Sequence, residues 1–333
     1  MKKNILYVLI MIISFGCTMN GENERGDTVA KIIFDTDMGP DYDDVGAITV
    51  LHALAANNEC EILACCASDS YPLIAPTIEV YNQYFGKPKI PIGVPSEDAP
   101  DYTCPNHWND SIVAKYLSVS KTNNDYSSAV EVYRKTLAAQ ADKSVTIVTV
   151  GFLSNLDLLL KSGPDKFSSL SGLNLIKKKV KILVTMAGEF PEGKEFNVLK
   201  HPEASYNVFK NWPTPILFSG FEVGNEIYTG RKLAENGSKD SPVAWAYRYN
   251  LDTFLGKKME KRNSWDQTAV LCAIRNPEKY FYVNGPGKFI IYEDGRNSWN
   301  PDIDAGHYFL THKYPCQYIA DIIDELMLFE PAK

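Results

Sequence analysis

The chain has 333 residues, of which 45% are hydrophobic and 23% are charged, and its formal net charge is −7. This composition is that of a globular protein with enough apolar material for one large domain. An acidic chain without a long run of Lys and Arg is poorly suited to bind phosphate backbones, so the composition argues against a nucleic-acid partner.

The N-terminal residues have the pattern of a bacterial export signal. Two lysines precede the apolar stretch 5–15, which is too short to cross a bilayer as a mature helix, and Cys17 follows a glycine. We expect residues 1–17 to be a lipoprotein-type signal peptide, with Cys17 lipidated as the first mature residue. A plain signal peptide with an incidental cysteine is the alternative.

The next segment, residues 18–28, is polar and lacks a core pattern, so we expect a flexible tether. Residues 29–333 show no internal repeat and no second linker, and we expect them to form one catalytic domain. The expected location is outside the cytoplasm, periplasmic or at the cell surface, with the lipid on Cys17 as the only membrane attachment. The six remaining cysteines are expected to be buried free thiols, although export would permit disulfides.

Strands and helices alternate along the chain. Apolar or β-branched runs predict strands at residues 31–34, 61–67, 90–94, 145–150, 180–186 and 216–219, and helical spacing predicts helices at residues 45–56, 76–85 and 127–141. This alternation predicts a single α/β domain with a mostly parallel, Rossmann-like central sheet flanked by helices. In such sheets the ligand binds at the carboxyl ends of the strands. The later segment 240–313 is expected to supply helices and loops that cover the site.

An acidic cluster follows the first predicted strand. Five carboxylates stand within ten residues, namely Asp35, Asp37, Asp41, Asp43 and Asp44. Packed at one turn they would repel each other, and a hard divalent cation is the simplest stabiliser, with oxygen ligands favouring Ca²⁺ or Mg²⁺. Helix capping explains one or two such acids but not five. The spacing is not that of an EF-hand, so the cluster predicts a different kind of metal site.

The segment 35–44, Asp-Thr-Asp-Met-Gly-Pro-Asp-Tyr-Asp-Asp, resembles the opening motif of the inosine–uridine-preferring nucleoside hydrolases, with an apparent two-residue insertion around Asp41. The resemblance implies the nucleoside hydrolase fold and a bound Ca²⁺. Asp37 and Asp44 would be calcium ligands, Asp37 would also be the catalytic base, and Asp43 would bind ribose hydroxyls. Asp35 would buttress the loop, and Asp41 is left as a spare candidate ligand.

Two segments near the middle of the chain resemble the same family in the same order. In residues 148–155, Val-Thr-Val-Gly-Phe-Leu-Ser-Asn, the residue before the glycine is Val150, whose backbone carbonyl would bind calcium. After Met186-Ala-Gly comes Glu195-Phe-Asn197, whose Glu195 and Asn197 would bind ribose hydroxyls. An ordinary surface loop is the alternative for this last segment.

A fourth match comes late in the chain, where Trp265 and Asp266 open an apolar segment. By the resemblance Asp266 would complete the calcium shell, and a helix cap is its alternative role. Many relatives have a histidine at the place of Trp265, which can protonate the leaving base. Tryptophan cannot do so usefully, but it can stack on a base, so Trp265 is expected to bind substrate.

Other departures concern the sugar and the leaving group. Asp69 stands near where relatives carry an asparagine that contacts ribose, and we expect it to substitute in binding substrate. Glu189 falls about where another such asparagine is common. The leaving-group acid stays unassigned, since lone histidines are more often structural; the candidates by chemistry alone are His107, His201, His307 and His312. Tyr228 and Trp299 could line a base pocket or belong to the core.

The resemblance implies calcium-dependent hydrolysis of the N-glycosidic bond of ribonucleosides, or of related N-ribosyl compounds, with release of ribose and a base. The expected partner is a small-molecule ribonucleoside, and assembly into a homo-oligomer stays open. One alternative is a non-catalytic lipoprotein that binds a ribosyl ligand on the same fold. The other is a haloacid-dehalogenase-like phosphatase, which shares the Asp-x-Asp after a strand but not the later Glu-Phe-Asn segment.

Overall fold

The computed structural model describes residues 29–331, so the predicted signal peptide at 1–17 and tether at 18–28 lie outside the described residues. The strands are β1 (Ala30–Thr36), β2 (Cys60–Ala67), β3 (Ile92–Val94), β4 (Ser127–Ser128), β5 (Val145–Thr149), β6 (Val180–Met186), β7 (Glu192–Gly193), β8 (Ile216–Ser219), β9 (Tyr228–Thr229), β10 (Arg262–Asn263), β11 (Phe281–Ile291), β12 (Asn297–Asn300) and β13 (His307–His312).

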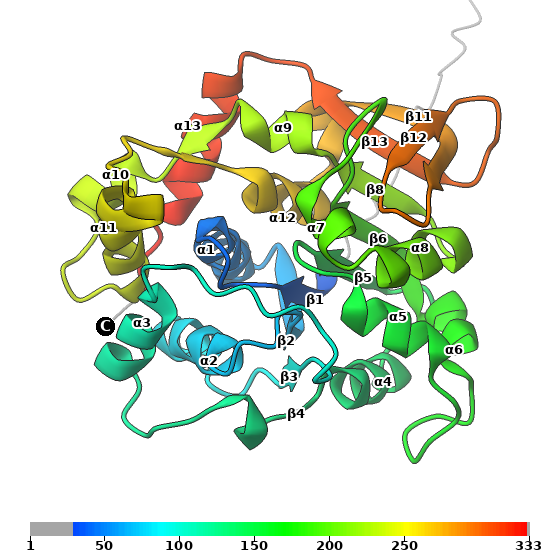
Figure 1. Cartoon of the computed structure of the whole chain (residues 1–333), viewed down its shortest axis with the longest axis horizontal. Coiled ribbons are helices and arrows are strands. Elements are labelled where there is room, and N and C mark those ends of the chain that lie inside the picture. The colour runs from blue at the N-terminus through cyan, green and yellow to red at the C-terminus, as the bar shows by residue number, and fades with distance from the viewer. Residues whose placement is uncertain (1–28, 332–333) are drawn as a thin grey trace, which may run out of the picture.

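The helices separate most of these strands along the chain (Figure 1). They are α1 (Asp43–Ala56), α2 (Ile74–Tyr84), α3 (Trp108–Tyr116), α4 (Ala129–Ala139), α5 (Ser154–Lys161), α6 (Gly172–Lys179), α7 (Phe196–Lys200), α8 (Pro202–Asn211), α9 (Phe221–Asn225), α10 (Arg231–Asn236), α11 (Pro242–Thr253), α12 (Trp265–Ile274) and α13 (Cys316–Met327).

One large sheet organises the domain, with the strand order β4-β3-β2-β1-β5-β6-β8-β13-β11-β12-β7. Strands from β4 to β13 in this order pair in parallel. β11 and β12 add antiparallel pairs at one side, and β7 pairs with β12. The predicted single α/β domain with a mostly parallel sheet is therefore confirmed.

The central strands are mostly apolar because most of their residues are buried on both faces of the sheet. Ile32 and Phe34 of β1 pack in one core with helices such as α1 and α12, whereas Ile33 packs in the other core with helices such as α4 and α5. This alternation follows from the two-residue period of a strand. It explains why β1 appears in the sequence as a continuous apolar run rather than as an alternating pattern.

β1 lies between β2 and β5, so the chain moves outward from β1 in both directions. The carboxyl ends of β1 and β5 thus flank a topological switch point, where open α/β sheets bind their ligands. The acidic segment 35–44 leaves β1 at this point and enters α1. The position predicted for the ligand site is therefore the one where the fold places the acidic cluster.

The predicted elements match the observed ones closely, with two corrections. Residues 127 and 128 form the short strand β4 before α4, rather than the first turn of the helix. The segment 240–313 contains α11 and α12 as expected, but also β11, β12 and β13 in place of loops. The interruption Gly285-Pro286-Gly287 inside β11 hides its strand pattern, and the register with β13 shifts at that point.

The six described cysteines are all free thiols, and all except the half-buried Cys316 are buried, as predicted. No helix within residues 29–331 is long and apolar enough to span a membrane.

Candidate active site

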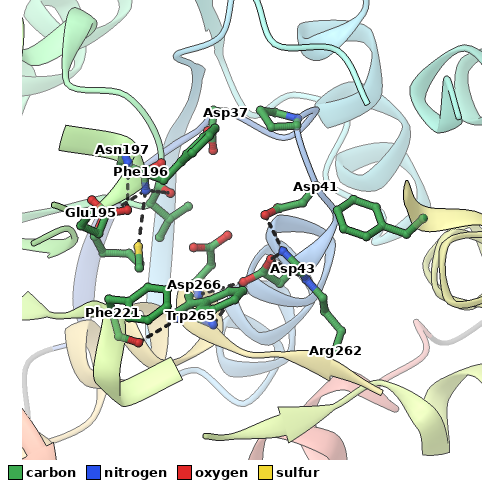
Figure 2. Close-up of a pocket in the computed structure, with 14 residues that line it drawn as sticks. Asp37, Asp41, Asp43, Glu195, Phe196, Asn197, Phe221, Arg262, Trp265 and Asp266 are labelled. Carbon is green, nitrogen blue, oxygen red and sulfur yellow. Dashed lines mark hydrogen bonds and ion pairs between the residues drawn. The ribbon is translucent and has the colours of Figure 1, made fainter. Parts of the chain in front are cut away.

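A cavity of about 300 Å³ opens at the carboxyl ends of β1 and β5. Figure 2 shows acids, polar groups and aromatic rings arranged around it. The lining residues come from segments far apart in the chain: Asp37, Pro40, Asp41, Asp43, Val150, Met186, Glu195, Phe196, Asn197, Phe221, Phe254, Arg262, Trp265 and Asp266.

The first acid of the cluster, Asp35, is buried behind the cavity. Its carboxylate accepts hydrogen bonds from the Tyr133 hydroxyl at 2.8 Å and from the Asn155 amide at 3.0 Å. Burial raises the pKa of Asp35 to about 7, against these donors, which lower it. Because Tyr133 lies in α4 and Asn155 in α5, Asp35 ties the end of β1 to two helices, which is the buttressing role expected for it.

The four groups predicted to hold a metal are gathered here. Asp37, Val150 and Asp266 line the cavity, and Asp44 lies buried at the start of α1. One Asp44 oxygen accepts from the Thr36 hydroxyl, and the other has no partner within residues 29–331. The Val150 carbonyl accepts from the Asn197 amide at 2.9 Å and keeps a second lone pair.

The electrostatics of these acids favour a cation. Burial, and after it repulsion from neighbouring acids, raises the pKa of Asp37, Asp44 and Asp266 well above the ordinary value of 3.8. Carboxylate and carbonyl oxygens form a donor set that suits a hard divalent cation. Within the described residues the three carboxylates do not all bring an oxygen within 4.8 Å of one another. The suitability of these residues for a divalent cation therefore rests on their oxygen donors, their shared negative charge and the unpartnered Asp44 oxygen.

Asp43 is tied into the protein more tightly than the sequence suggests. One oxygen accepts from Arg262 Nε at 3.1 Å and Nη2 at 2.7 Å, and the other accepts from the backbone N–H of Trp265 at 3.1 Å. It lines the cavity, but these contacts make it a bridge between α1 and the start of α12. Direct ribose binding by Asp43 would require it to share these oxygens.

Arg262 is the functional residue that the sequence did not reveal. It pairs with Asp41 as well as with Asp43, and both acids raise its pKa even though burial lowers it. Its guanidinium carbon lies 5.1–5.2 Å from the ring centroids of Tyr42, Phe254 and Trp265. The available signal was indirect: five crowded acids need cationic partners, and an arginine stands three residues before Trp265.

Glu195 and Asn197, which were expected to bind ribose hydroxyls, both line the cavity, and Glu195 also caps α7. Its oxygens accept the backbone N–H groups of Gly188, Asn197 and Val198, and burial raises its pKa to about 7. The Asn197 amide donates to the carbonyls of Val150 and Met186, at 2.9 and 3.2 Å. These bonds hold the α7 segment against the ends of β5 and β6.

The structure corrects the expectation for Asp69, which does not line the cavity. It is fully buried, and its two oxygens accept the backbone N–H groups of Tyr71 at 2.7 Å and Tyr102 at 2.8 Å. Burial raises its pKa to about 7. Asp69 therefore holds the loops after β2 in place. Both of its oxygens are used by backbone donors and are not directed at a sugar in the cavity.

Aromatic rings form part of the wall of the cavity. Trp265 stacks on Phe221 with ring centroids 5.5 Å apart, and its indole N–H donates to the Phe221 carbonyl at 2.9 Å. Phe196 and Phe254 also line the cavity, whereas Tyr228 and Trp299 do not. Such faces suit the stacking of a planar heterocycle.

No histidine of the described residues lines the cavity. His201 bonds the Ser154 hydroxyl at 2.8 Å, and His307 Nδ1 accepts the Phe289 N–H at 3.1 Å, so both have structural partners. Arg262 is the one cationic side chain among the lining residues.

The chain is similar in sequence and in fold to known proteins. A family model described as inosine-uridine preferring nucleoside hydrolase matches residues 32–308. The uncharacterized protein C1683.06c of Schizosaccharomyces pombe is 27% identical over 215 residues, which are 61% of this chain and 64% of that protein. The pyrimidine-specific ribonucleoside hydrolase RihA of Escherichia coli is 31% identical over 139 residues, 41% of this chain and 42% of that one.

The matches to these two curated relatives thus span less than two thirds of each relative's length. The solved structure of an inosine-guanosine nucleoside hydrolase has a TM-score of 0.68 at 17% identity, and the match covers 90% of this chain and 99% of that one. At this identity the likeness is one of fold.

Proposed function

This chain belongs to the inosine-uridine preferring nucleoside hydrolase family, and from that premise we propose that it hydrolyses the N-glycosidic bond of ribonucleosides, or of related N-ribosyl compounds, in a calcium-dependent reaction. One observation carries the proposal. A single cavity at the switch point of the sheet joins acids suited to a cation, polar groups suited to a sugar, and aromatic rings suited to a base. The phosphatase alternative is incompatible with membership of this family.

We propose Ca²⁺ as the ion, with Asp37, Asp44, Asp266 and the Val150 carbonyl as its protein ligands. All are oxygen donors, which Ca²⁺ prefers, and burial makes their shared negative charge costly without a cation. When bound, the ion would lower the pKa of a coordinated water and help to orient the sugar hydroxyls.

Asp37 is proposed as the base that takes a proton from the attacking water. Its side chain lines the cavity and makes no side-chain hydrogen bond with the described residues, so its oxygens are free to meet water. A carboxylate that lines the cavity and has no other side-chain partner can accept a proton from the attacking water as the new bond to the sugar forms.

The sugar would be held by side chains that keep an unused oxygen facing the cavity. The Asn197 Oδ1 atom and one oxygen of Asp41 make no hydrogen bond with the described residues, although Asp41 pairs with Arg262 through the other. Contacts to the ribose hydroxyls can strengthen as positive charge develops on the ring in the oxocarbenium-like transition state. We therefore propose Asp41, rather than Asp43 alone, as a ribose-binding acid.

The base would leave along the aromatic wall formed by Phe221 and Trp265. No histidine of the described residues lines the cavity, and Arg262 is the cationic side chain that does. Its guanidinium can therefore donate a hydrogen bond to the departing base. Its Nη1 makes no hydrogen bond with the described residues and can donate to a ligand. This arrangement favours bases that leave readily without strong protonation.

The deciding experiment measures ribose release by the full chain from a panel of ribonucleosides, with Ca²⁺ and with a chelator. Release should require Ca²⁺ and should fall by about a thousandfold or more in Asp37→Asn, since a general base and a metal ligand are lost together. Asp41→Asn should mainly raise KM. The control is Asp302→Asn, at an exposed acid outside the cavity, which should keep full activity.

Calcium-dependent ligand binding with no release from any nucleoside would reject catalysis and favour the binding-protein alternative. Release that persists in the chelator would reject the role of the ion.

We also propose that the protein acts outside the cytoplasm as a lipid-anchored enzyme that salvages nucleosides. The support is the sequence of residues 1–17, with its lysine pair, apolar stretch and Cys17. Metabolic labelling with a radioactive fatty acid should label the wild-type chain and not Cys17→Ser. An unlabelled wild-type chain in the cytoplasmic fraction would reject the proposal.

A further inference from the structure

A second cluster of ligand side chains lies outside the cavity. Glu226, His312 and Cys316 each place one ligand atom within 4.8 Å of the others, and none of them lines the active-site cavity. We propose that these three residues form a separate binding site for a transition-metal ion of the zinc type.

The three ligands come from segments that the fold brings together. Glu226 follows α9, His312 ends β13, and Cys316 is the first residue of α13. Figure 1 shows these three elements meeting along the upper edge of the molecule. The site therefore depends on the tertiary structure, because Glu226 is 86 residues before His312 in the chain.

The donor types select the metal. A thiolate, an imidazole and a carboxylate form a mixed sulfur, nitrogen and oxygen set that suits Zn²⁺ and is a poor set for Ca²⁺ or Mg²⁺. A zinc site with three protein ligands leaves a fourth position of the tetrahedron for water. Glu226 is exposed and the other two are half-buried, so an ion can reach the cluster from solvent.

The distances are close to those of a filled site. Bonds of roughly 2.0–2.3 Å in a tetrahedron place neighbouring ligand atoms roughly 3.3–3.8 Å apart. The Cys316 sulfur already lies 3.6 Å from His312 Nδ1. The remaining separations, at most 4.8 Å, need to close by about one ångström, which small side-chain rotations achieve.

A contact outside the cluster orients the histidine. His312 Nε2 lies 3.3 Å from the Glu222 backbone carbonyl, so a hydrogen on Nε2 leaves the Nδ1 lone pair facing the Cys316 sulfur. Metal-binding histidines commonly donate their second ring N–H to a carbonyl in this way. The Glu222 carbonyl also ties the cluster to α9, which carries Phe221 of the cavity wall.

The electrostatics give the ion a role in the fold. A divalent cation offsets the repulsion between the thiolate and the carboxylate. A bound ion would also join α9, β13 and α13 at one point, independently of any nucleoside or calcium at the active site.

The test is a titration of the full chain with Co²⁺ in excess Ca²⁺, followed by absorption spectroscopy. The expected result is one equivalent of bound Co²⁺ with a thiolate-to-cobalt charge-transfer band, which Zn²⁺ abolishes by displacement. Oxygen ligands in the acidic cavity cannot give that band. Cys316→Ser should remove it, and His312→Gln should weaken Co²⁺ binding by at least about tenfold.

The matched control is His107→Asn, which removes an exposed histidine outside the cluster and should leave the titration unchanged. Asparagine also tolerates the positive φ of 49° at that position. Far-ultraviolet circular dichroism checks that each variant is folded. A wild-type chain without the charge-transfer band, a band that survives in Cys316→Ser, or an unchanged Co²⁺ affinity in His312→Gln would overturn the proposal.

Discussion

Each acid of the cluster has its own set of partners. Asp35 receives side-chain donors from the helix layer behind it, and Asp43 receives a backbone N–H and the Arg262 guanidinium. Asp37 and Asp266 make no side-chain hydrogen bond within the described residues, and Asp44 accepts one from the Thr36 hydroxyl but keeps its other oxygen without a partner in the described chain. The division of donors therefore decides which acids are structural and which are left for a cation.

Arg262→Met should destabilise the fold strongly. It leaves the buried Asp43 without its charge partner, and removing one member of a buried ion pair costs about 3–5 kcal/mol. Urea unfolding measures the loss. Arg296→Met, which breaks an exposed pair with Asp294, is the matched control and should change little. Equal effects of the two variants would contradict the structural role of Arg262.

Trp265→Ala should raise KM for ribonucleosides about tenfold or more and change kcat less, because stacking of a base on an aromatic ring is worth about 1–3 kcal/mol. Steady-state kinetics of ribose release measure both constants. The control is Trp245→Ala, since Trp245 stacks on Tyr249 outside the cavity. An unchanged KM in Trp265→Ala would place the base elsewhere.

At the scale of the elements, the site depends on how closely the ends of β1 and β5 approach each other. A Cβ atom on Gly151, just after β5, would lie 2.4 Å from the Asp37 backbone nitrogen and 2.7 Å from its Cβ. Only glycine permits this approach, which brings the Val150 carbonyl and the Asp37 carboxylate to the same cavity. The strand ends thus set the position of two proposed calcium ligands.

Gly151→Ala should move Asp37 and reduce both stability and activity. The added methyl group must push the backbone of the 35–44 segment aside, and such overpacking costs about 1–3 kcal/mol. Gly163→Ala is the matched control, because its added Cβ meets no atom within 4 Å. Thermal unfolding and calcium-dependent ribose release should separate the two variants. Normal calcium affinity in Gly151→Ala would contradict this packing argument.

At the scale of the whole molecule, the fold buries several carboxyl groups and raises their pKa values. Burial raises the pKa of Asp35 and Glu195 to about 7, and burial with mutual repulsion raises those of Asp37, Asp44 and Asp266. Between their unfolded and folded pKa values the folded chain binds more protons than the unfolded chain. Their contribution to stability is therefore lost as the pH rises through the folded pKa values.

Without Ca²⁺, the free energy of unfolding should fall as the pH rises from about 6.5 through about 7, the folded pKa of Asp35 and Glu195. This range lies above the ordinary histidine pKa, so the buried His52 and His307, whose pKa values are lowered to about 4, contribute little slope there. Ca²⁺ should flatten the dependence by binding the ionised acids. Urea unfolding at several pH values, with chelator and with Ca²⁺, measures both curves.

Asp266→Asn should reduce the dependence of the unfolding free energy on pH that is measured with chelator. The exposed control Asp302→Asn should leave that dependence unchanged. The same slope with and without Ca²⁺ would mean that the raised acids do not form the ion site.

The sequence alone was sufficient to predict the α/β class, the parallel core of the sheet and the strand end that carries the site. These features depend on local patterns: β1 is apolar because both of its faces are buried, and the acids of 35–44 directly follow it. The predicted cavity residues Asp37, Val150, Glu195, Asn197, Trp265 and Asp266 belong to short motifs, so they too could be found along the chain.

Only the tertiary structure decided which groups compensate which acids. Arg262 reaches Asp43 across 219 residues, and Asp69 accepts backbone N–H groups instead of lining the cavity. The fold also brings Cys316 close to Glu226. The strand β11 was likewise hidden by its Gly-Pro-Gly interruption and formed by pairing with β13. Local sequence sets periodicity and motif, but a long-range partner is fixed by packing, where burial makes every unpaired charge or donor costly.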